Sequence, residues 1–210
     1  MPIILPSSLL SLDVRVGDCR ELLRAMPDES VQCCVTSPPY WGLRDYGHAG
    51  QIGQEDTPEL FVQAMVEVFR EVRRVMKADG TCWLNLGDSY YNKSLTGVPW
   101  RVALGMVADG WRLRSDIIWH KPNPMPESAT DRPTKSHEYI FLLTKSESYY
   151  YDHEAIKEPA EYPDDKRRPV GSKGAWEIDG REQRANGGGK AYDHDTSMRN
   201  KRSVWKVTAR

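Results

Sequence analysis

The chain has 210 residues, 39% of them hydrophobic and 28% charged, and its formal net charge is −1. This composition excludes a disordered or collagen-like chain, and no stretch approaches the roughly 18 apolar residues of a transmembrane helix. The four cysteines form no CxxC pair and no cluster with histidine, which predicts small buried side chains and neither a zinc site nor disulfides.

The first ten residues are apolar but lack the basic start of a secretory signal, so we expect a cytoplasmic protein with no membrane association. Strand and helix signals then alternate as far as residue 151, which predicts an α/β domain. Asp18 with Glu21 resembles a capping box, and Thr57 before Pro58 predicts a helix start. In chain order we expect a strand at 12–16, a helix from Asp18 to Pro27, a strand at 31–36, a helix from Pro58 to Gly80, a strand at 81–86, a helix at 99–109, a strand at 111–119, and a C-terminal antiparallel hairpin of 138–144 with 149–151.

The most informative segment is Thr36-Ser37-Pro38-Pro39-Tyr40, at the carboxyl end of a strand that we predict to be buried. Ligands of open α/β sheets lie just beyond such strand ends. The two prolines fix the backbone and donate no hydrogen bond, which leaves the Pro38 carbonyl and the Ser37 hydroxyl as held acceptors beside the Tyr40 ring. Two acceptors and an aromatic wall suit a planar substrate with an amino group, whose nitrogen attacks an electrophilic methyl more readily when its hydrogens are gripped.

Val-Thr-Ser-Pro-Pro-Tyr, at 35–40, closely resembles the catalytic motif of DNA amino methyltransferases, which transfer a methyl group from S-adenosylmethionine to cytosine N4 or adenine N6. The Ser form of the motif is most similar to the cytosine-N4 branch, and adenine N6 is the alternative. The resemblance extends through LNLGDSY at 84–90, IIWHKPN at 117–123 and HEYIF at 137–141, in the order of the circularly permuted group whose catalytic half comes first. It implies a Rossmann-like methyltransferase sheet, S-adenosylmethionine as cofactor, and double-stranded DNA from which the target base is flipped.

The resemblance also implies roles for single residues. The catalytic set is Ser37, Pro38, Pro39 and Tyr40, in which Ser37 and the Pro38 carbonyl orient the amine and Tyr40 stacks on the base. The residues expected to contact the cofactor are Asp18 and Thr36. The residues expected to contact DNA are Trp41, Arg44, Asp88, Lys121 and Asn123. Other interpretations stay open. Asp18 is equally a helix N-cap, Asp88 a turn residue, Trp41 a packing residue and Lys121 a solvated lysine.

One family feature is missing. Amino methyltransferases bind the cofactor through a glycine-rich turn, commonly Asp-Pro-Phe-x-Gly-x-Gly, whereas the glycine cluster at 187–189 opens no apolar helix. In the permuted order that turn follows the recognition region, and RSVWKV at 202–207 resembles the segment that precedes it. We therefore expect an incomplete sheet with a gap between 12–16 and 31–36, and a truncated or split enzyme whose cofactor-binding half is missing; a homodimer is the other expected assembly.

Charge divides the chain near Pro159. Residues 1–159, the expected catalytic part, carry 17 Lys and Arg against 22 Asp and Glu, whereas residues 160–210 carry 12 against 8. This basic, Gly-rich part, with basic or glycine-rich stretches at 166–168, 171–174 and 186–190, falls where permuted methyltransferases begin their target-recognition region, and its charge suits phosphate contacts. A solvated linker is the alternative.

The setting that the resemblance implies is bacterial or phage restriction–modification, with a cognate restriction endonuclease as partner. A function of another class also stays open. The chain is then a non-catalytic DNA-binding remnant that retains the base pocket and has lost cofactor binding.

Overall fold

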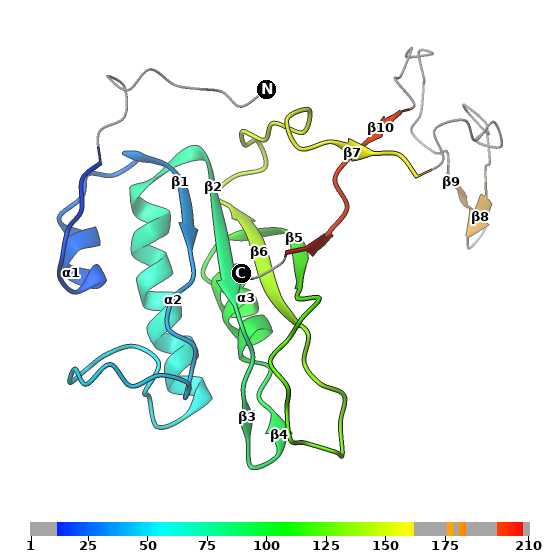
Figure 1. Cartoon of the computed structure of the whole chain (residues 1–210). Helices are drawn as coiled ribbons and strands as arrows, with labels where there is room; N and C mark the ends of the chain where they lie inside the picture. Colours follow the sequence, from blue (N-terminus) through cyan, green and yellow to red (C-terminus); the bar gives the residue numbers. More distant parts are fainter. Residues whose placement is uncertain (1–11, 162–175, 179–180, 184–196, 208–210) are drawn as a thin grey trace. The chain divides into compact units, whose positions relative to one another are not determined.

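The structure is a computed structural model that describes residues 12–161, 176–178, 181–183 and 197–207 (Figure 1). Contacts divide the chain into two units, one containing Met1–Tyr150 and Ser203–Arg210 and the other Tyr151–Arg202. The first unit holds a five-stranded sheet and all the described α-helices. Within the described residues, no helix is both long enough and apolar enough to cross a membrane.

The sheet of the first unit is mixed and has the strand order β1-β2-β6-β5-β11. The strands are β1 (Val31–Thr36), β2 (Met76–Leu86), β6 (His137–Thr144), β5 (Arg112–His120) and β11 (Val204–Lys206). β1 is parallel to β2, β6 is antiparallel to both β2 and β5, and β11 is parallel to β5. β1 therefore forms one edge of the sheet among the described residues. A small hairpin of β3 (Tyr90–Tyr91) and β4 (Ser94–Leu95) follows β2.

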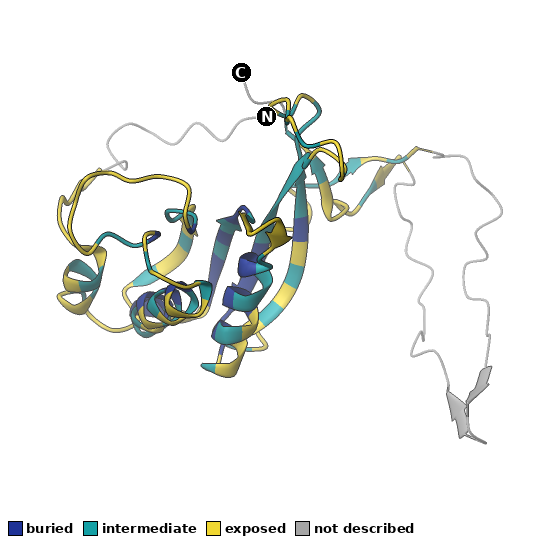
Figure 2. Cartoon of the chain, turned by 90° about the horizontal axis from the view of Figure 1, so that it is seen from below, coloured by how far each residue is buried: buried dark blue, intermediate teal, exposed yellow. Residues whose placement is uncertain are grey.

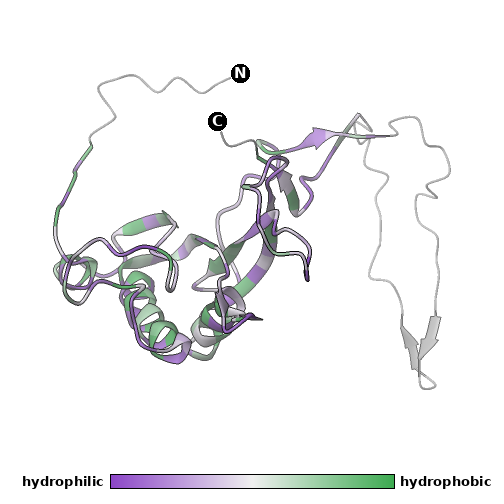
Figure 3. Ribbon diagram, turned by 60° about the horizontal axis from the view of Figure 1, so that its bottom comes forward, coloured by the Kyte–Doolittle hydropathy of each residue, from purple (hydrophilic) through white to green (hydrophobic). Residues whose placement is uncertain are grey.

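The core of this unit lies between the sheet and two helices, α2 (Pro58–Val75) and α3 (Val98–Ala108), which cover the same face. α2 begins as predicted, because the Thr57 hydroxyl accepts a hydrogen bond from Leu60 N at 3.2 Å. Along β2 the alternate residues Cys82, Leu84 and Leu86 are fully buried, as the two-residue period of a strand requires (Figure 2). They share one cluster with the apolar stripe of α2, whose other side is hydrophilic (Figure 3). A third helix, α1 (Cys19–Arg24), contacts α2.

The second unit contains short antiparallel pairs. β7 (Glu158–Pro159) pairs with β10 (Met198–Arg199), and β8 (Trp176–Ile178) pairs with β9 (Arg181–Gln183). Glu158 forms ion pairs with Arg199, Lys201 and Arg202 at 3.1, 3.2 and 2.7 Å, so three basic residues of the 160–210 part share one carboxylate, which offsets only part of their charge. The stretches at 166–168, 171–174 and 186–190 lie outside the described residues.

The predicted α/β class and Rossmann-like sheet are confirmed, while one predicted strand is absent and one helix boundary is wrong. Residues 12–16 form no strand, and their apolar side chains are exposed, because the described chain offers them no strand to pair with. The helix predicted to reach Gly80 ends at Val75, and β2 begins at Met76. Met76 is fully buried and pairs with Val31, so sheet pairing overrides the helical pattern there.

The predicted hairpin is also wrong in its second arm. β6 is present at the expected place, but residues 149–151 are not a strand. Both edges of β6 are taken by β2 and β5, so no hydrogen-bonding edge is left for a further strand. The strand expected to be buried, β1, has Cys33 exposed and Val35 77% exposed, since it lies at the sheet edge. Cys82 is buried as predicted, whereas Cys19 is exposed, and all four cysteines are free thiols.

Candidate active site

The segment 37–40 leaves the sheet at the carboxyl end of β1, as the sequence predicts. A long loop supports it. Gly42 N donates to Gly53 O at 2.8 Å, and a Cβ at Gly53 would lie 3.1 Å from both Pro39 Cβ and the Tyr40 carbonyl oxygen. Gly53 also has a φ of +104°, a backbone region that other residues rarely adopt. The close approach of this loop therefore holds the proline turn in place.

Four polar side chains meet at this strand end. The Tyr40 hydroxyl donates to Glu138 Oε2 at 2.7 Å and lies 3.3 Å from Ser37 Oγ. Asn85 Nδ2 lies within donor distance of all three of the other groups: 3.0 Å from Tyr40 Oη, 3.0 Å from Glu138 Oε2 and 3.4 Å from Ser37 Oγ. Parallel pairing of β1 with β2 and antiparallel pairing of β2 with β6 bring these residues together from positions 37 to 138.

The carboxylate of this cluster is kept ionised. Burial opposes ionisation of Glu138, whose side chain is 16% exposed, but hydrogen bonds from Lys121, Tyr40 and Asn85 outweigh burial and lower its pKa. Lys121, just after β5, forms an ion pair with Glu138 Oε1. Burial raises the pKa of Tyr40, and the neighbouring Glu138 raises it further. Tyr40 is therefore a neutral donor and Glu138 an anionic acceptor near pH 7.

Gly87 fixes the position of the Tyr40 ring. A Cβ at this glycine would lie 2.6 Å from Tyr40 Cε2 and 2.9 Å from Cδ2, so only a hydrogen at this position lets the ring approach. Sequence reasoning placed Gly87 next to a pocket residue without giving it this role. The close contact makes the position of the Tyr40 hydroxyl a packing property of the strand end.

The predicted DNA-contacting residues lie in different surroundings. Trp41 is 7% exposed, and its indole Nε1 donates to Glu55 O at 2.8 Å, so it packs into the core under the turn. Arg44 and Asn123 are exposed. Lys121 is half-exposed and joins the Ser37–Tyr40 cluster through Glu138, rather than standing free as a solvated lysine.

The predicted turn role of Asp88 and cap role of Asp18 both have direct structural support. The Asp88 side chain is 4% exposed, and its Oδ1 accepts from Thr96 Oγ1 at 2.8 Å and from Val98 N at 3.3 Å, at the start of α3. Asp18 Oδ1 accepts from Arg20 N at 2.8 Å as the N-cap of α1; the Arg20 guanidinium, which also donates to this carboxylate, and the Arg20 backbone N–H together lower the pKa of Asp18 to about 2. Thr36 is half-buried at the last position of β1.

Sequence reasoning did not name Asn85 or Glu138. Both lie in segments that it singled out, 84–90 and 137–141; Asn85 stands between two leucines at the carboxyl end of β2, whereas Glu138 follows His137 at the start of β6. Asn85 at the carboxyl end of β2 is a local signal for a site, because ligands of α/β sheets lie at that edge, whereas Glu138 at the start of β6 carries no such signal. The pairing of β6 between β2 and β5, which delivers Glu138, is not visible in the local sequence.

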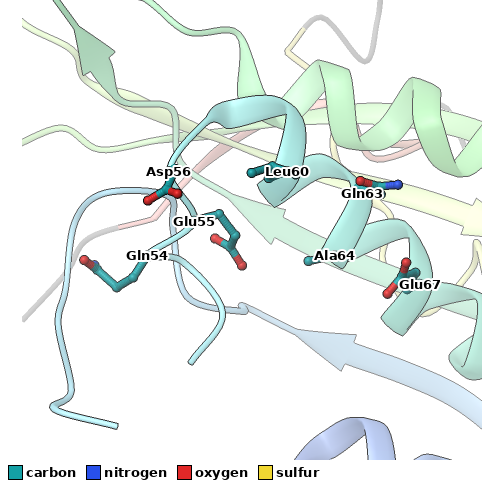
Figure 4. A pocket seen from close by; sticks show the side chains of 7 residues that line it. All are labelled: Gln54, Glu55, Asp56, Leu60, Gln63, Ala64 and Glu67. Atoms are coloured by element: carbon teal, nitrogen blue, oxygen red, sulfur yellow. The ribbon is translucent and has the colours of Figure 1, made fainter. Parts of the chain in front are cut away.

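A separate hollow of about 410 Å³ lies beside the start of α2 (Figure 4). It is lined by Gln54, Glu55 and Asp56 from the preceding loop and by Leu60, Gln63, Ala64 and Glu67 from the helix. None of the predicted site residues lines it, and its carboxylates repel phosphate. The polar cluster at the end of β1 is therefore the candidate site. Among the described residues, no group of side chains is arranged to hold a metal ion.

Comparisons with known proteins identify the family of the chain. The DNA methylase family matches residues 31–206. Type II methyltransferase M.SmaI of Serratia marcescens is 50% identical over 188 residues, covering 76% of this chain and 64% of the relative. Type II methyltransferase M.XycI of Xanthomonas campestris pv. cyanopsidis is 41% identical, covering 100% of this chain and 67% of the relative. The chain thus spans about two thirds of the length of these relatives.

Two solved structures share the fold. TTHA0409 from Thermus thermophilus, a putative DNA modification methylase solved in complex with S-adenosyl-L-methionine, has a TM-score of 0.52 and 29% identity, covering 65% of this chain and 54% of that chain. The PvuII DNA methyltransferase (cytosine-N4-specific) has a TM-score of 0.57 and 21% identity, covering 67% and 51%, and supports the fold alone. The family match spans most of the chain and includes the whole Ser37–Glu138 cluster, so the chain belongs to the DNA methylase family.

Proposed function

We propose that this protein is a site-specific DNA methyltransferase that transfers a methyl group from S-adenosylmethionine to an exocyclic amino group, with cytosine N4 as the target. The observation that carries this proposal is the cluster at the end of β1, where Ser37 Oγ lies beside Tyr40 and Asn85. The Ser form of the motif favours cytosine N4, on its resemblance to that branch. We expect the protein to act on DNA in the cytoplasm, beside a cognate restriction endonuclease.

The chemistry required of this chain is orientation of the amine. The amino nitrogen of a base is a poor nucleophile, because its lone pair is delocalised into the ring. In the described residues no hydrogen bond is donated to the Pro38 carbonyl, and Ser37 keeps one lone pair free besides the one that faces Asn85 Nδ2. These two acceptors grip the amino hydrogens and favour a pyramidal nitrogen, while the Tyr40 ring stacks on the flipped base. S-adenosylmethionine supplies the methyl group.

The described residues fit part of a cofactor site. Asp18 and Thr36 offer a carboxylate and a hydroxyl, but the Asp18 carboxylate is engaged by Arg20, and the hollow beside α2 includes neither residue. The exposed edge at β1 leaves room for another strand. We therefore propose that a further segment, or a second copy of the chain, completes the cofactor site. Residues 160–210 begin the target-recognition region in this proposal, and the exposed Arg44 and Asn123 contact DNA.

The test uses the 210-residue chain with unmodified genomic DNA and S-adenosylmethionine, alone and mixed with the remaining third of M.XycI. The matching part of M.XycI, joined with the same remaining third, is the positive control. Digestion to nucleosides and mass spectrometry identify the product. N4-methylcytosine supports the proposal, and N6-methyladenine refutes the choice of base. If the control is active but neither the chain alone nor the mixture methylates a base, and the chain still binds DNA in a salt-sensitive way, the non-catalytic DNA-binding function is indicated instead.

Two further measurements address single parts of the proposal. Ser37→Ala should reduce methyl transfer by about 100-fold, with DNA affinity changed less than about threefold, because one oriented acceptor is lost from the transition state. Equal rates in that variant would remove Ser37 from the mechanism. Calorimetric titration of the chain alone should detect no S-adenosylmethionine binding; micromolar affinity would refute the need for a completing segment.

A further inference from the structure

The hydrogen bonds of the Ser37–Tyr40 cluster have a direction that one residue determines. An ionised carboxylate accepts and never donates, so the Tyr40 hydroxyl must use its single hydrogen on Glu138. The Tyr40 oxygen is then left with lone pairs only, and it accepts from Asn85 Nδ2. Ser37 must therefore donate to Tyr40 at 3.3 Å; of its two lone pairs one faces Asn85 Nδ2 at 3.4 Å, and the other is left for a ligand.

We infer that Glu138 is a positioning residue for the methylation reaction, because it fixes the direction of the hydrogen-bond chain Ser37–Tyr40–Glu138 and thereby presents Ser37 Oγ as an acceptor to the target amine. The inference rests on the proposed function, since the amine is the ligand of that function. Glu138 lies beyond Tyr40 from Ser37 and acts through it. A neutral Glu138 removes the constraint, because it can donate to Tyr40. Tyr40 then donates to Ser37, and the Ser37 hydrogen points at the amino hydrogens.

The charged groups around Glu138 hold it in the accepting state. From the end of β5, Lys121 forms an ion pair with Glu138 Oε1. Lys135, in the loop before β6, also interacts electrostatically with Glu138. Burial lowers the pKa of Lys135, while the negative charges of Asp88 and Glu138 oppose that shift. From β2 the neutral Asn85 amide donates, and from the turn after β1 Tyr40 donates. Two cations and two donors thus face Glu138, and no second carboxylate hydrogen-bonds to it among the described residues.

The kinetic test is a double-mutant cycle with Glu138→Gln and Tyr40→Phe, assayed for methyl transfer in the mixture that is active. The glutamine side chain keeps the volume of the glutamate but carries an amide that can donate to Tyr40. We expect Glu138→Gln to lower kcat by about tenfold or more with KM for DNA nearly unchanged. In the Tyr40→Phe background, the same substitution should have almost no further effect, because the connecting hydroxyl is absent. Independent, multiplicative losses would indicate a merely structural role and overturn the inference.

A control removes a comparable carboxylate elsewhere. Asp109 pairs with Arg70 at 2.5 Å beyond the end of α3, so Asp109→Asn loses a charged pair without touching the cluster, and kcat should stay within about twofold. Lys121→Met should raise the pKa of Glu138 and move the acid limb of kcat to higher pH, since the ionised form is the active one. An unmoved limb, or an unchanged kcat in Glu138→Gln, would refute the positioning role.

A spectroscopic measurement keeps the inference testable if no mixture transfers a methyl group, an outcome that refutes the proposed function alone. The carbon-13 signal of the Tyr40 ring, assigned with Tyr40→Phe among the ten tyrosines, is followed from about pH 8 to about pH 3. Protonation of Glu138 should shift this signal with a midpoint below the ordinary range of glutamate, and the shift should vanish in Glu138→Gln. A titration that is identical in both proteins would show that Glu138 does not determine the direction of the Ser37–Tyr40–Glu138 hydrogen bonds.

Discussion

Gly87→Ala is the smallest change that should uncouple the cluster without removing any of its polar groups. The new methyl group would lie 2.6 Å from Tyr40 Cε2. Ordinary carbon–carbon contacts begin near roughly 3.5 Å, so the ring must move by about 0.9 Å, or the backbone must give way by the same amount. Gly87 is buried at the end of β2, where neighbouring strands restrict backbone movement.

The magnitude follows from the Tyr40–Glu138 hydrogen bond. A displacement of about 0.9 Å along that bond would stretch its 2.7 Å length to about 3.6 Å, beyond hydrogen-bond distance. We expect a cost in the free energy of unfolding of about 1–3 kcal/mol for the overpacked site. The loss in kcat should be larger than stability explains, about 10–100-fold, because misplacement by about 1 Å at a site costs that much.

The assay compares Gly87→Ala with Gly105→Ala. A Cβ at Gly105 would lie 2.9 Å from Val66 Cγ2 between α3 and α2, so this control introduces a similar clash away from the cluster. Urea unfolding reports the stability of each variant, and methyl transfer reports its activity. The Gly105 variant should keep its kcat while it remains folded. If Gly87→Ala also keeps its kcat, then the position of the Tyr40 ring does not matter and the argument fails.

Two further predictions concern residues with both a structural and a proposed binding role. Asp18→Ala should lower helix stability by about 1 kcal/mol, whereas Asp18→Ser keeps the cap and should cost little; raised KM for S-adenosylmethionine in both variants would support a cofactor contact. Because the pKa of Asp18 is lowered to about 2, the contribution of its carboxylate to the stability of α1 should be lost as pH falls from about 4 to 2, which circular dichroism can follow. Asp88→Ala should cost about 2–4 kcal/mol in urea unfolding, since Thr96 and Val98 lose a buried acceptor. An unchanged unfolding free energy would contradict the anchoring role.

The parts of the fold that sequence predicts well are those with a local cause. Thr57 caps α2, Asp18 caps α1, and the 31–36 segment forms β1, all as their residue types indicate. The errors have non-local causes. The pattern of α2 continues past Val75, but pairing with β1 draws Met76 into β2. The pairing of β6 with β5 across a loop of 16 residues competes with the short turn that a local hairpin would use.

The candidate site divides in the same way. The turn at Ser37 and Tyr40 is predictable, because its chemistry is contained in consecutive residues. Glu138 is not predictable from its surroundings, since one carboxylate in a β-strand is as compatible with solvent as with a site. Only the antiparallel placement of β6 beside β2 carries it to Asn85, which itself reads locally as one polar residue among leucines. Recognising a residue that positions another side chain, such as Glu138, thus requires the sheet topology, whereas the residues proposed to contact the substrate can be recognised from the local sequence.

The edge at β1 is where the strand that we propose to complete the cofactor site would be added. Natural edge strands are usually protected by charges, prolines or strong bulges. β1, with the sequence VQCCVT, has a register shift between Val31 and Cys33 but no charge or proline, and Val35 is 77% exposed. Segment 12–16, in which three apolar residues alternate with Asp13 and Arg15, is likewise exposed, on the β1 side of the sheet (Figure 1). A strand added parallel to β1 would satisfy the edge and end beside Thr36, because parallel strands end at the same edge. The acceptors for the amine need only β1, β2 and β6, which are present, whereas the residues assigned to the cofactor, Asp18 and Thr36, lie on the side of the sheet where that strand would be added.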